Sequence, residues 1–287
     1  MVIYNPKDWW KLILSFQKSD TFRMMLPGII GIAVFTWLIV YFELVVLDLH
    51  YKNTTSIHAL VGFVLSMLLV FRTNTAYDRW WEGRRLWGSF VNNARNLALK
   101  LSSLVETPAE RERLKILIQN YVAASKEHLR DGVRPELLKA CDKYSIADMT
   151  MNAHVPNRIM QLLYDEIILL TRTGVMTQEH LLFINSELQS FTDNIGACER
   201  IKKTPIPFSY SIFLKKIIFI YIISMPFGFA MEFGYWAVLI VPLLFYIFGS
   251  IELIAEEIED PFGTDDNDLP TDQISETISA NLDEIFK

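Results

Sequence analysis

The chain has 287 residues, of which 51% are hydrophobic and 13% aromatic, and its formal net charge is −6. This composition argues against an ordinary soluble domain, which holds fewer apolar residues and distributes them with helical or strand periodicity. Here the apolar residues form blocks with almost no charge, which are 24–42, 57–71, 217–231 and 233–251. The sequence therefore indicates an all-α integral membrane protein.

Residues 1–23 combine charged side chains with aromatic ones, including Trp9, Trp10 and Phe16. They contain no continuous apolar stretch followed by a cleavage site, so a cleaved secretory signal is not expected. Indole rings favour the headgroup level of a membrane. We therefore predict that residues 1–23 form an interfacial amphipathic helix.

Residues 24–71 are expected to hold the first two transmembrane helices. The block from Met24 to Val46 is long enough to cross a hydrocarbon core of about 30 Å. The block from Ile57 to Phe71 is short, and the helical pattern continues past Arg72. The second helix is therefore predicted either to continue into the cytosol or to have its polar half shielded by neighbouring protein.

Residues 72–207 have the polarity of a cytosolic helical region. Apolar residues that recur every three or four positions predict three helices. These cover Glu110–Leu129, Arg158–Arg172 and Gln178–Cys198. Pro205 and Pro207 follow two residues apart, a spacing that a regular helix cannot accommodate. The chain is therefore expected to change direction at Ile206.

Residues 208–254 are predicted to form a transmembrane hairpin, because only Glu232 and Gly234 interrupt its two apolar blocks. Pro226 and Pro242 should kink its two arms. Residues 255–287 follow as an acidic cytosolic C-terminal tail. The expected architecture is thus four transmembrane helices per subunit and a cytosolic helical domain.

The placement of Lys and Arg predicts the orientation in the membrane. Residues 1–23 hold four of them, 72–216 hold twenty-one, and 217–286 hold none. Positive residues collect on the cytosolic side, so both termini are expected in the cytoplasm.

Three apolar side chains, Phe63, Met67 and Phe71, are spaced by four and therefore share one helix face. On a pore axis, rings of such side chains could form a constriction that gates by dewetting. The spacing alone favours ordinary helix packing.

A polar and aromatic run follows this stripe. Its candidates for lining a vestibule or an interface are Arg72, Asn74, Asp78 and Arg79. Interfacial anchoring by Trp and Arg, together with structural ion pairs, explains the same run equally well.

The acidic tail contains Asp265, Asp266 and Asp268, whose oxygens suit a metal such as calcium. The EF-hand template fails, because Leu269 stands at a ligand position and Pro270 at the glycine position. A solvated acidic linker is the preferred interpretation.

Enzyme motifs are missing from the sequence, which has no HExxH, GxSxG, Walker loop or GxGxxG, and its five histidines are scattered. Cys141 and Cys198 have no metal-ligand spacing and are expected to be reduced and structural. We therefore predict no enzymatic activity and no cofactor.

Three separated segments resemble the bacterial branch of the bestrophin family, in the same order. They read FRTNTAYDRWWEGRRLWGSFVNNARN, GACERIKKTPIPFSY and IEDPFGTDDNDLP. With the layout of apolar blocks, the resemblance covers most of the chain and thins between about residues 105 and 190 and beyond 272.

The resemblance implies a homopentamer around a central pore in the bacterial inner membrane. It implies that Phe63, Met67 and Phe71 line the neck and that Ile206 lines a cytosolic aperture. Animal relatives carry a run of consecutive acids as a calcium clasp where this chain reads TDDND, so calcium gating is not expected.

The function expected from the sequence is passive conduction of small monovalent ions. Bacterial relatives resemble cation channels, and the net charge also favours cation selectivity. The alternatives are an anion (chloride) channel as in animal relatives, a non-conducting membrane scaffold and, more weakly, a membrane enzyme. The expected partners are further copies of the chain, the lipid bilayer and monovalent ions, and no nucleic acid.

Overall fold

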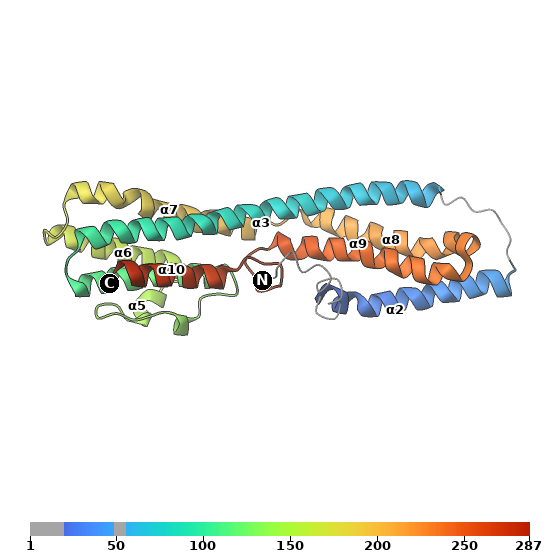
Figure 1. The fold of residues 1–287 in the computed structure, drawn as a ribbon, viewed down its shortest axis with the longest axis horizontal. Helices are drawn as coiled ribbons and strands as arrows, with labels where there is room; N and C mark the ends of the chain where they lie inside the picture. The colour runs from blue at the N-terminus through green and yellow to red at the C-terminus, as the bar shows by residue number, and fades with distance from the viewer. Residues whose placement is uncertain (1–19, 49–55) are drawn as a thin grey trace. The chain divides into compact units, whose positions relative to one another are not determined.

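The computed structural model describes residues 20–48 and 56–287, and within these ranges it contains helices and no strand (Figure 1). The predicted all-α class is confirmed for this part of the chain. Most of the predicted interfacial helix 1–23 lies outside the described residues. The chain divides into two compact units, which alternate along the sequence.

Of the described residues, the first unit comprises 20–48, 56–80, 205–260 and 265–267. Its elements are α2 (Asp20–Tyr41), the π-helical turn η2 (Phe42–Val46), the beginning of α3 (Ser56–Leu104), α8 (Phe208–Phe233), the 3-10 turn η4 (Gly234–Trp236) and α9 (Ala237–Glu259). Helices α2, α8 and α9 pack against one another. The tight hairpin expected from the sequence is present, with η4 joining α8 to α9.

Among the described residues, three helical stretches are long and apolar enough to cross a membrane, namely Thr21–Val46, Ser56–Leu104 and Phe208–Glu259. The third contains both α8 and α9. Pro226 and Pro242 lie inside these helices, where neighbouring helices can satisfy the freed backbone groups. The kinks expected at these prolines stay a prediction.

The core of the first unit lies between α3, α8 and α9. Leu65 and Leu69 of α3 are buried there against Ile222 and Met225 of α8 and Val241 of α9. Without a hydrophobic driving force in lipid, such helices depend on close van der Waals packing. The face of α3 that carries Leu65 and Leu69 is therefore the one turned toward its own subunit.

Gly62 allows α3 to approach α8 closely, because a Cβ at this position would collide with the Tyr221 side chain. The Tyr221 hydroxyl donates a hydrogen bond to the His58 carbonyl at 3.1 Å. A small residue on α3 and a large one on α8 thus set the distance between the two helices.

The second unit comprises residues 81–204, 261–264 and 268–287. Its elements are the remainder of α3, then α4 (Pro108–His128), the 3-10 turn η3 (Pro135–Leu137), α5 (Ile146–Thr150), α6 (Val155–Arg172), α7 (Gln178–Lys203) and α10 (Thr271–Ile285) (Figure 1). Helices α4, α6 and α7 match the three helices expected from the apolar spacing.

Four aromatic side chains from α3, α4 and α7 form the centre of this unit. Trp87, Phe90, Tyr121 and Phe191 are buried, with ring centroids 5.3–6.3 Å apart between contacting pairs. The Tyr121 hydroxyl donates to the Phe191 carbonyl at 2.9 Å, which satisfies its polar group within the core.

Helix α10 was not foreseen in the acidic tail. It packs against α4, and its residues Ile278 and Leu282 are buried. Lys126 and Arg130 pair with Asp272 at its first turn, with a shortest N–O distance of 2.6 Å in each pair. The acidic side chains therefore hold part of the tail on the second unit.

Candidate functional site

The stripe predicted to line a pore points away from the core of its own subunit. Phe63, Met67 and Phe71 are 68%, 51% and 53% exposed, whereas Leu65 and Leu69 on the same helix are 1% and 2% exposed. Because helical side chains repeat every 3.6 residues, these two sets lie on different faces of α3. The stripe is thus free to contact lipid, another subunit or a pore.

Polar side chains continue this exposed face toward the C-terminal part of α3. Asn74 lies three residues after Phe71 and Asp78 lies seven residues after it, so both are on the same side of the helix as the stripe. Both side chains are exposed. One face of α3 therefore changes from bulky apolar groups to polar ones within the first unit.

Arg72, in contrast, is buried against its own subunit. Its side chain is 1% exposed and pairs with two carboxylates of α9. The Nη2 atom lies 2.6 Å from Glu259 Oε2, and the Nε atom lies 3.6 Å from Glu252 Oε2. In this subunit Arg72 connects α3 to α9 and does not present its charge to a vestibule.

Arg79 contacts the last residue of α9, and the neighbouring Trp80 contacts the segment that follows α9. The Arg79 Nε donates to the Glu259 carbonyl at 3.0 Å, and the Trp80 indole donates to the Asn267 carbonyl at 3.0 Å. Asn267 donates in turn to Glu257 at 2.5 Å. The polar run after the stripe therefore serves largely to hold α3 and the end of α9 together.

Ile206 occupies the turn between Pro205 and Pro207, as the sequence led us to expect. Its side chain is 9% exposed and packs with Ala76 of α3 and Ala255 of α9. Its backbone N–H donates to Glu259 Oε1 at 2.6 Å. The turn is thus fixed to α9 by a charge-assisted hydrogen bond.

Glu259, which the sequence analysis did not single out, connects two of the predicted site residues. One oxygen of its carboxylate accepts from Arg72 and the other from Ile206. Glu259 lies inside the quoted motif IEDPFGTDDNDLP, directly before DPFG, and this position was the signal in the sequence that could have identified it.

The acidic segment does not form a convergent ligand set in the part of the chain that the structure describes. Asp265 and Asp266 are exposed, whereas Asp268 is 1% exposed. Phe262 of the DPFG segment is also buried, and its ring lies 3.1 Å from where a Cβ of Gly83 would be. This segment therefore has a packing role around Phe262.

A family model described as the bacterial/fungal bestrophin protein matches residues 1–284. The chain belongs to the bestrophin family. The predicted family membership is confirmed, and the match extends across the region where the motif resemblance was thin.

Two relatives of this bestrophin are named voltage-dependent anion channel-forming proteins. The one from Nostoc is 39% identical over 230 residues, which cover 78% of this chain and 75% of the relative. The one from Synechocystis is 32% identical over 298 residues, which cover 99% and 93%. The family is one of membrane ion channels and not of enzymes.

The crystal structure of a bacterial bestrophin homolog from Klebsiella pneumoniae matches with a TM-score of 0.83 and 25% identity. The match covers 91% of this chain and 98% of that chain. The helical fold of this bestrophin is therefore the fold of solved members of its family.

Proposed function

We propose that this bestrophin is one subunit of a homopentameric channel that conducts small monovalent ions passively across the bacterial inner membrane. The observation that carries the proposal is the exposure of Phe63, Met67 and Phe71 on a helix whose other face is buried. Several copies of such a helix around an axis would bring these side chains together as the narrow neck of a pore.

A neck of this kind needs no charged side chain in the bilayer. Apolar constrictions control conduction by their width and by how readily they lose water. The exposed polar residues Asn74 and Asp78 lie on the same side of α3, beyond the stripe. This order, apolar and then polar along one face, is what a neck that widens into a wet vestibule requires.

The second constriction is proposed at Ile206, on the basis of the family resemblance. Because its side chain packs on Ala76 and Ala255, only its 9% exposed edge would face the ion path. The hydrogen bond from its N–H to Glu259 would hold that edge at a fixed distance from the axis.

Four crossings per subunit are proposed from α2, α3, α8 and α9, with both termini in the cytoplasm. The long apolar stretch 208–259 contains two helices joined by a tight turn, which fits a hairpin that enters and leaves on one side. The concentration of Lys and Arg in 72–216 supports a cytosolic second unit.

Two candidates exist for the sign of the ion. The relatives' names describe anion channels and favour anions, whereas the net charge of −6 favours cations. Charges on the protein surface are screened over about 8–10 Å at physiological salt, so net charge is the weaker argument. We therefore propose anion conduction ahead of cation conduction.

Purified protein reconstituted into a planar bilayer tests both the activity and the sign of the conducted ion. A salt gradient across a planar bilayer should give currents that reverse close to the potential of the anion. Reversal near the potential of the cation would select the second candidate. Silence in every gradient, with correctly oligomeric protein in the membrane, would support the non-conducting scaffold and refute the channel.

A further inference from the structure

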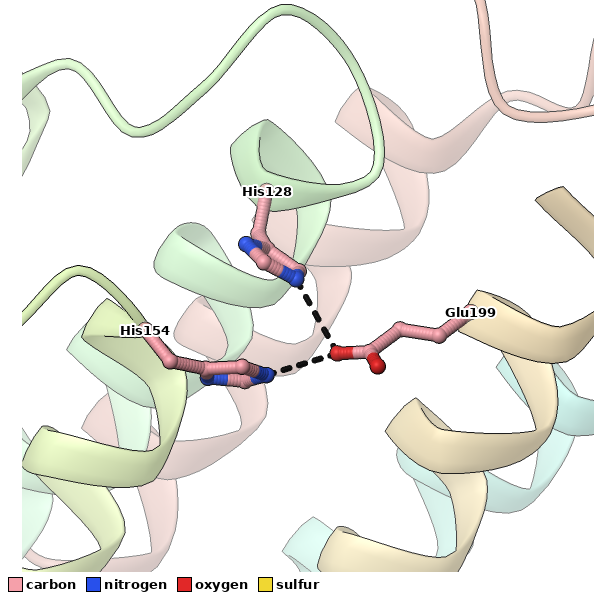
Figure 2. Close-up of side chains that lie close together, drawn as sticks. All are labelled: His128, His154 and Glu199. Carbon is pink, nitrogen blue, oxygen red and sulfur yellow. Dashed lines mark hydrogen bonds and ion pairs between the residues drawn. The ribbon is translucent and has the colours of Figure 1, made fainter. Parts of the chain in front are cut away.

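Three side chains from different helices of the second unit converge on one point (Figure 2). His128 ends α4, His154 precedes the first turn of α6, and Glu199 lies in the last part of α7. Both imidazole rings point toward the same carboxylate oxygen, Oε1, with His128 Nε2 at 3.0 Å and His154 Nε2 at 2.6 Å. The sequence did not indicate this cluster, because 45 and 71 residues separate the histidines from Glu199.

The geometry of the cluster suits a metal ion. The three potential ligand atoms lie within 4.8 Å of one another, and no other such group occurs among the residues that the structure describes. Zinc binds imidazole nitrogen at about 2.0–2.1 Å and carboxylate oxygen at about 2.0–2.2 Å, so tetrahedral ligands lie roughly 3.3–3.5 Å apart. Small side-chain rotations would open the cluster to that spacing.

The cluster is accessible from water. The side chains of His128, His154 and Glu199 are 24%, 32% and 18% exposed, which leaves a side open for a water ligand.

One cation already contacts the carboxylate. Lys203 Nζ lies 3.3 Å from Glu199 Oε2, one helical turn further along α7. Its side chain is 70% exposed, so it can turn into solvent when another cation takes its place. A surface pair of this kind contributes little stability and is not a barrier to a metal.

The surrounding hydrogen bonds fix the three elements. Lys202 of α7 donates to the Leu129 carbonyl at 2.7 Å and also to the Arg130 carbonyl, which holds the end of α4 beside α7. The Asn157 N–H donates to His154 Nδ1 at 3.2 Å and turns Nε2 toward Glu199. A metal bound to His154 Nε2 requires the ring proton to be on Nδ1. Nδ1 could then no longer accept from the Asn157 N–H, so this 3.2 Å hydrogen bond would be lost when the metal binds.

We propose that His128, His154 and Glu199 bind one divalent transition-metal ion, for which zinc is the best match. Two imidazoles with one carboxylate are a ligand set of zinc, whereas magnesium and calcium require oxygen ligands throughout. The ion would connect α4, α6 and α7 and stabilise the second unit, because it binds the folded chain. The site is independent of the proposed channel activity.

The test uses the full-length, untagged protein in detergent, stripped of metal with a chelator and then titrated with zinc chloride by calorimetry. We expect one saturable site per chain and a higher Tm in excess zinc. Loss of an outer-shell partner alone weakens metal binding about 10–100-fold, so Glu199→Gln and His154→Gln should each weaken it at least about tenfold. Magnesium chloride at the same concentration should change neither signal.

The matched control is His180→Gln, at the start of α7, where His180 Nδ1 accepts from the Thr177 N–H away from the cluster. It should bind zinc as the wild type does. Cobalt(II) gives a second measurement, because tetrahedral coordination produces visible absorption that Glu199→Gln should abolish. If Glu199→Gln does not elute from a size-exclusion column at the volume of the wild type, and is therefore misfolded, His128→Gln is used in its place.

Equal zinc affinity in the wild type and in both cluster variants would overturn the proposal. The proposal would also be overturned if the wild type had no saturable zinc site while Glu199→Gln had a lower Tm than the wild type. That second result would mean that the three side chains form only a hydrogen-bonded structural link.

Discussion

Arg72 and Glu259 form a buried ion pair with an N–O distance of 2.6 Å, and the same carboxylate accepts the backbone N–H of Ile206. Arg72 directly follows Phe71, the last residue of the proposed neck, and Ile206 is the proposed aperture. One side chain of α9 thus connects the residues at both proposed constrictions within a single unit of the subunit. A change at either end of this link should therefore affect the other.

The variant Glu259→Gln should destabilise the subunit and alter ion selectivity. Arg72 is 1% exposed, and a buried charge that loses its partner costs about 3–5 kcal/mol. We expect the low end of that range, because Glu252 still lies 3.6 Å from Arg72. Thermal unfolding in detergent measures the stability, and reversal potentials measure the selectivity.

Glu256→Gln is the matched control, since Glu256 lies on the same helix and pairs with Lys215 at the surface, where both side chains are more than 40% exposed. Exposed pairs contribute about 0–1 kcal/mol, so this variant should leave both Tm and reversal potential close to wild type. Equal effects of the two variants would contradict the role given to Glu259.

A second prediction concerns the contact between α3 and α8. Gly62→Ala should lower stability by about 1–3 kcal/mol, the usual cost of an extra methyl group in a packed core, because the new Cβ would collide with Tyr221. Gly31→Ala on α2 has nothing within 4 Å and should be close to neutral. Tyr221→Phe should partly rescue Gly62→Ala, and a lack of rescue in thermal unfolding would assign the loss to another cause.

The third prediction concerns Glu166, which is fully buried in the second unit. Its carboxylate accepts from Arg113 at 2.6 Å, from Lys143 at 2.6 Å and from the Tyr144 hydroxyl at 3.1 Å. Burial alone would raise the pKa of Glu166, but the hydrogen bonds from Lys143 and Arg113 outweigh it and hold the pKa below its usual value. Glu166→Gln should therefore cost about 3–5 kcal/mol at neutral pH.

The sign of the pH dependence follows from that lowered pKa. The stability contributed by Glu166 is complete above the unfolded-state pKa of about 4.3 and is lost as pH falls through the lower folded-state value. The difference in Tm between wild type and Glu166→Gln should thus shrink only below about pH 4. A difference that vanishes already at pH 6 would contradict the assignment. Glu112→Gln is the control, because the Glu112 side chain that pairs with Lys115 is 55% exposed.

The apolar blocks and the three and four spacings were enough to predict the helices, because both patterns are local in sequence. The region 110–198 shows this, where three expected helices correspond to α4, α6 and α7. Helix α10 was missed because its many acids suggested a solvated tail. The spacing of Ile274, Ile278 and Leu282 was a signal that the acidic composition concealed.

The contacts that position the candidate sites could not be predicted in the same way. Glu259 meets Arg72 across 187 residues, and Glu199 meets His128 across 71. Such pairs depend on how helices pack, which no local pattern records. The exposure of the stripe needed the structure as well, since spacing alone places side chains on one face without saying what that face contacts.

The unitary conductance of Met67→Ala in a planar bilayer tests the central claim most directly. Met67 is 51% exposed on the stripe, whereas Val61 is 37% exposed on the same helix and lies about 120° away around its axis. If the stripe lines a shared neck, Met67→Ala should raise the conductance severalfold and Val61→Ala should leave it unchanged. Wild-type conductance in Met67→Ala, in channels that still open, would show that this face of α3 does not line the ion path.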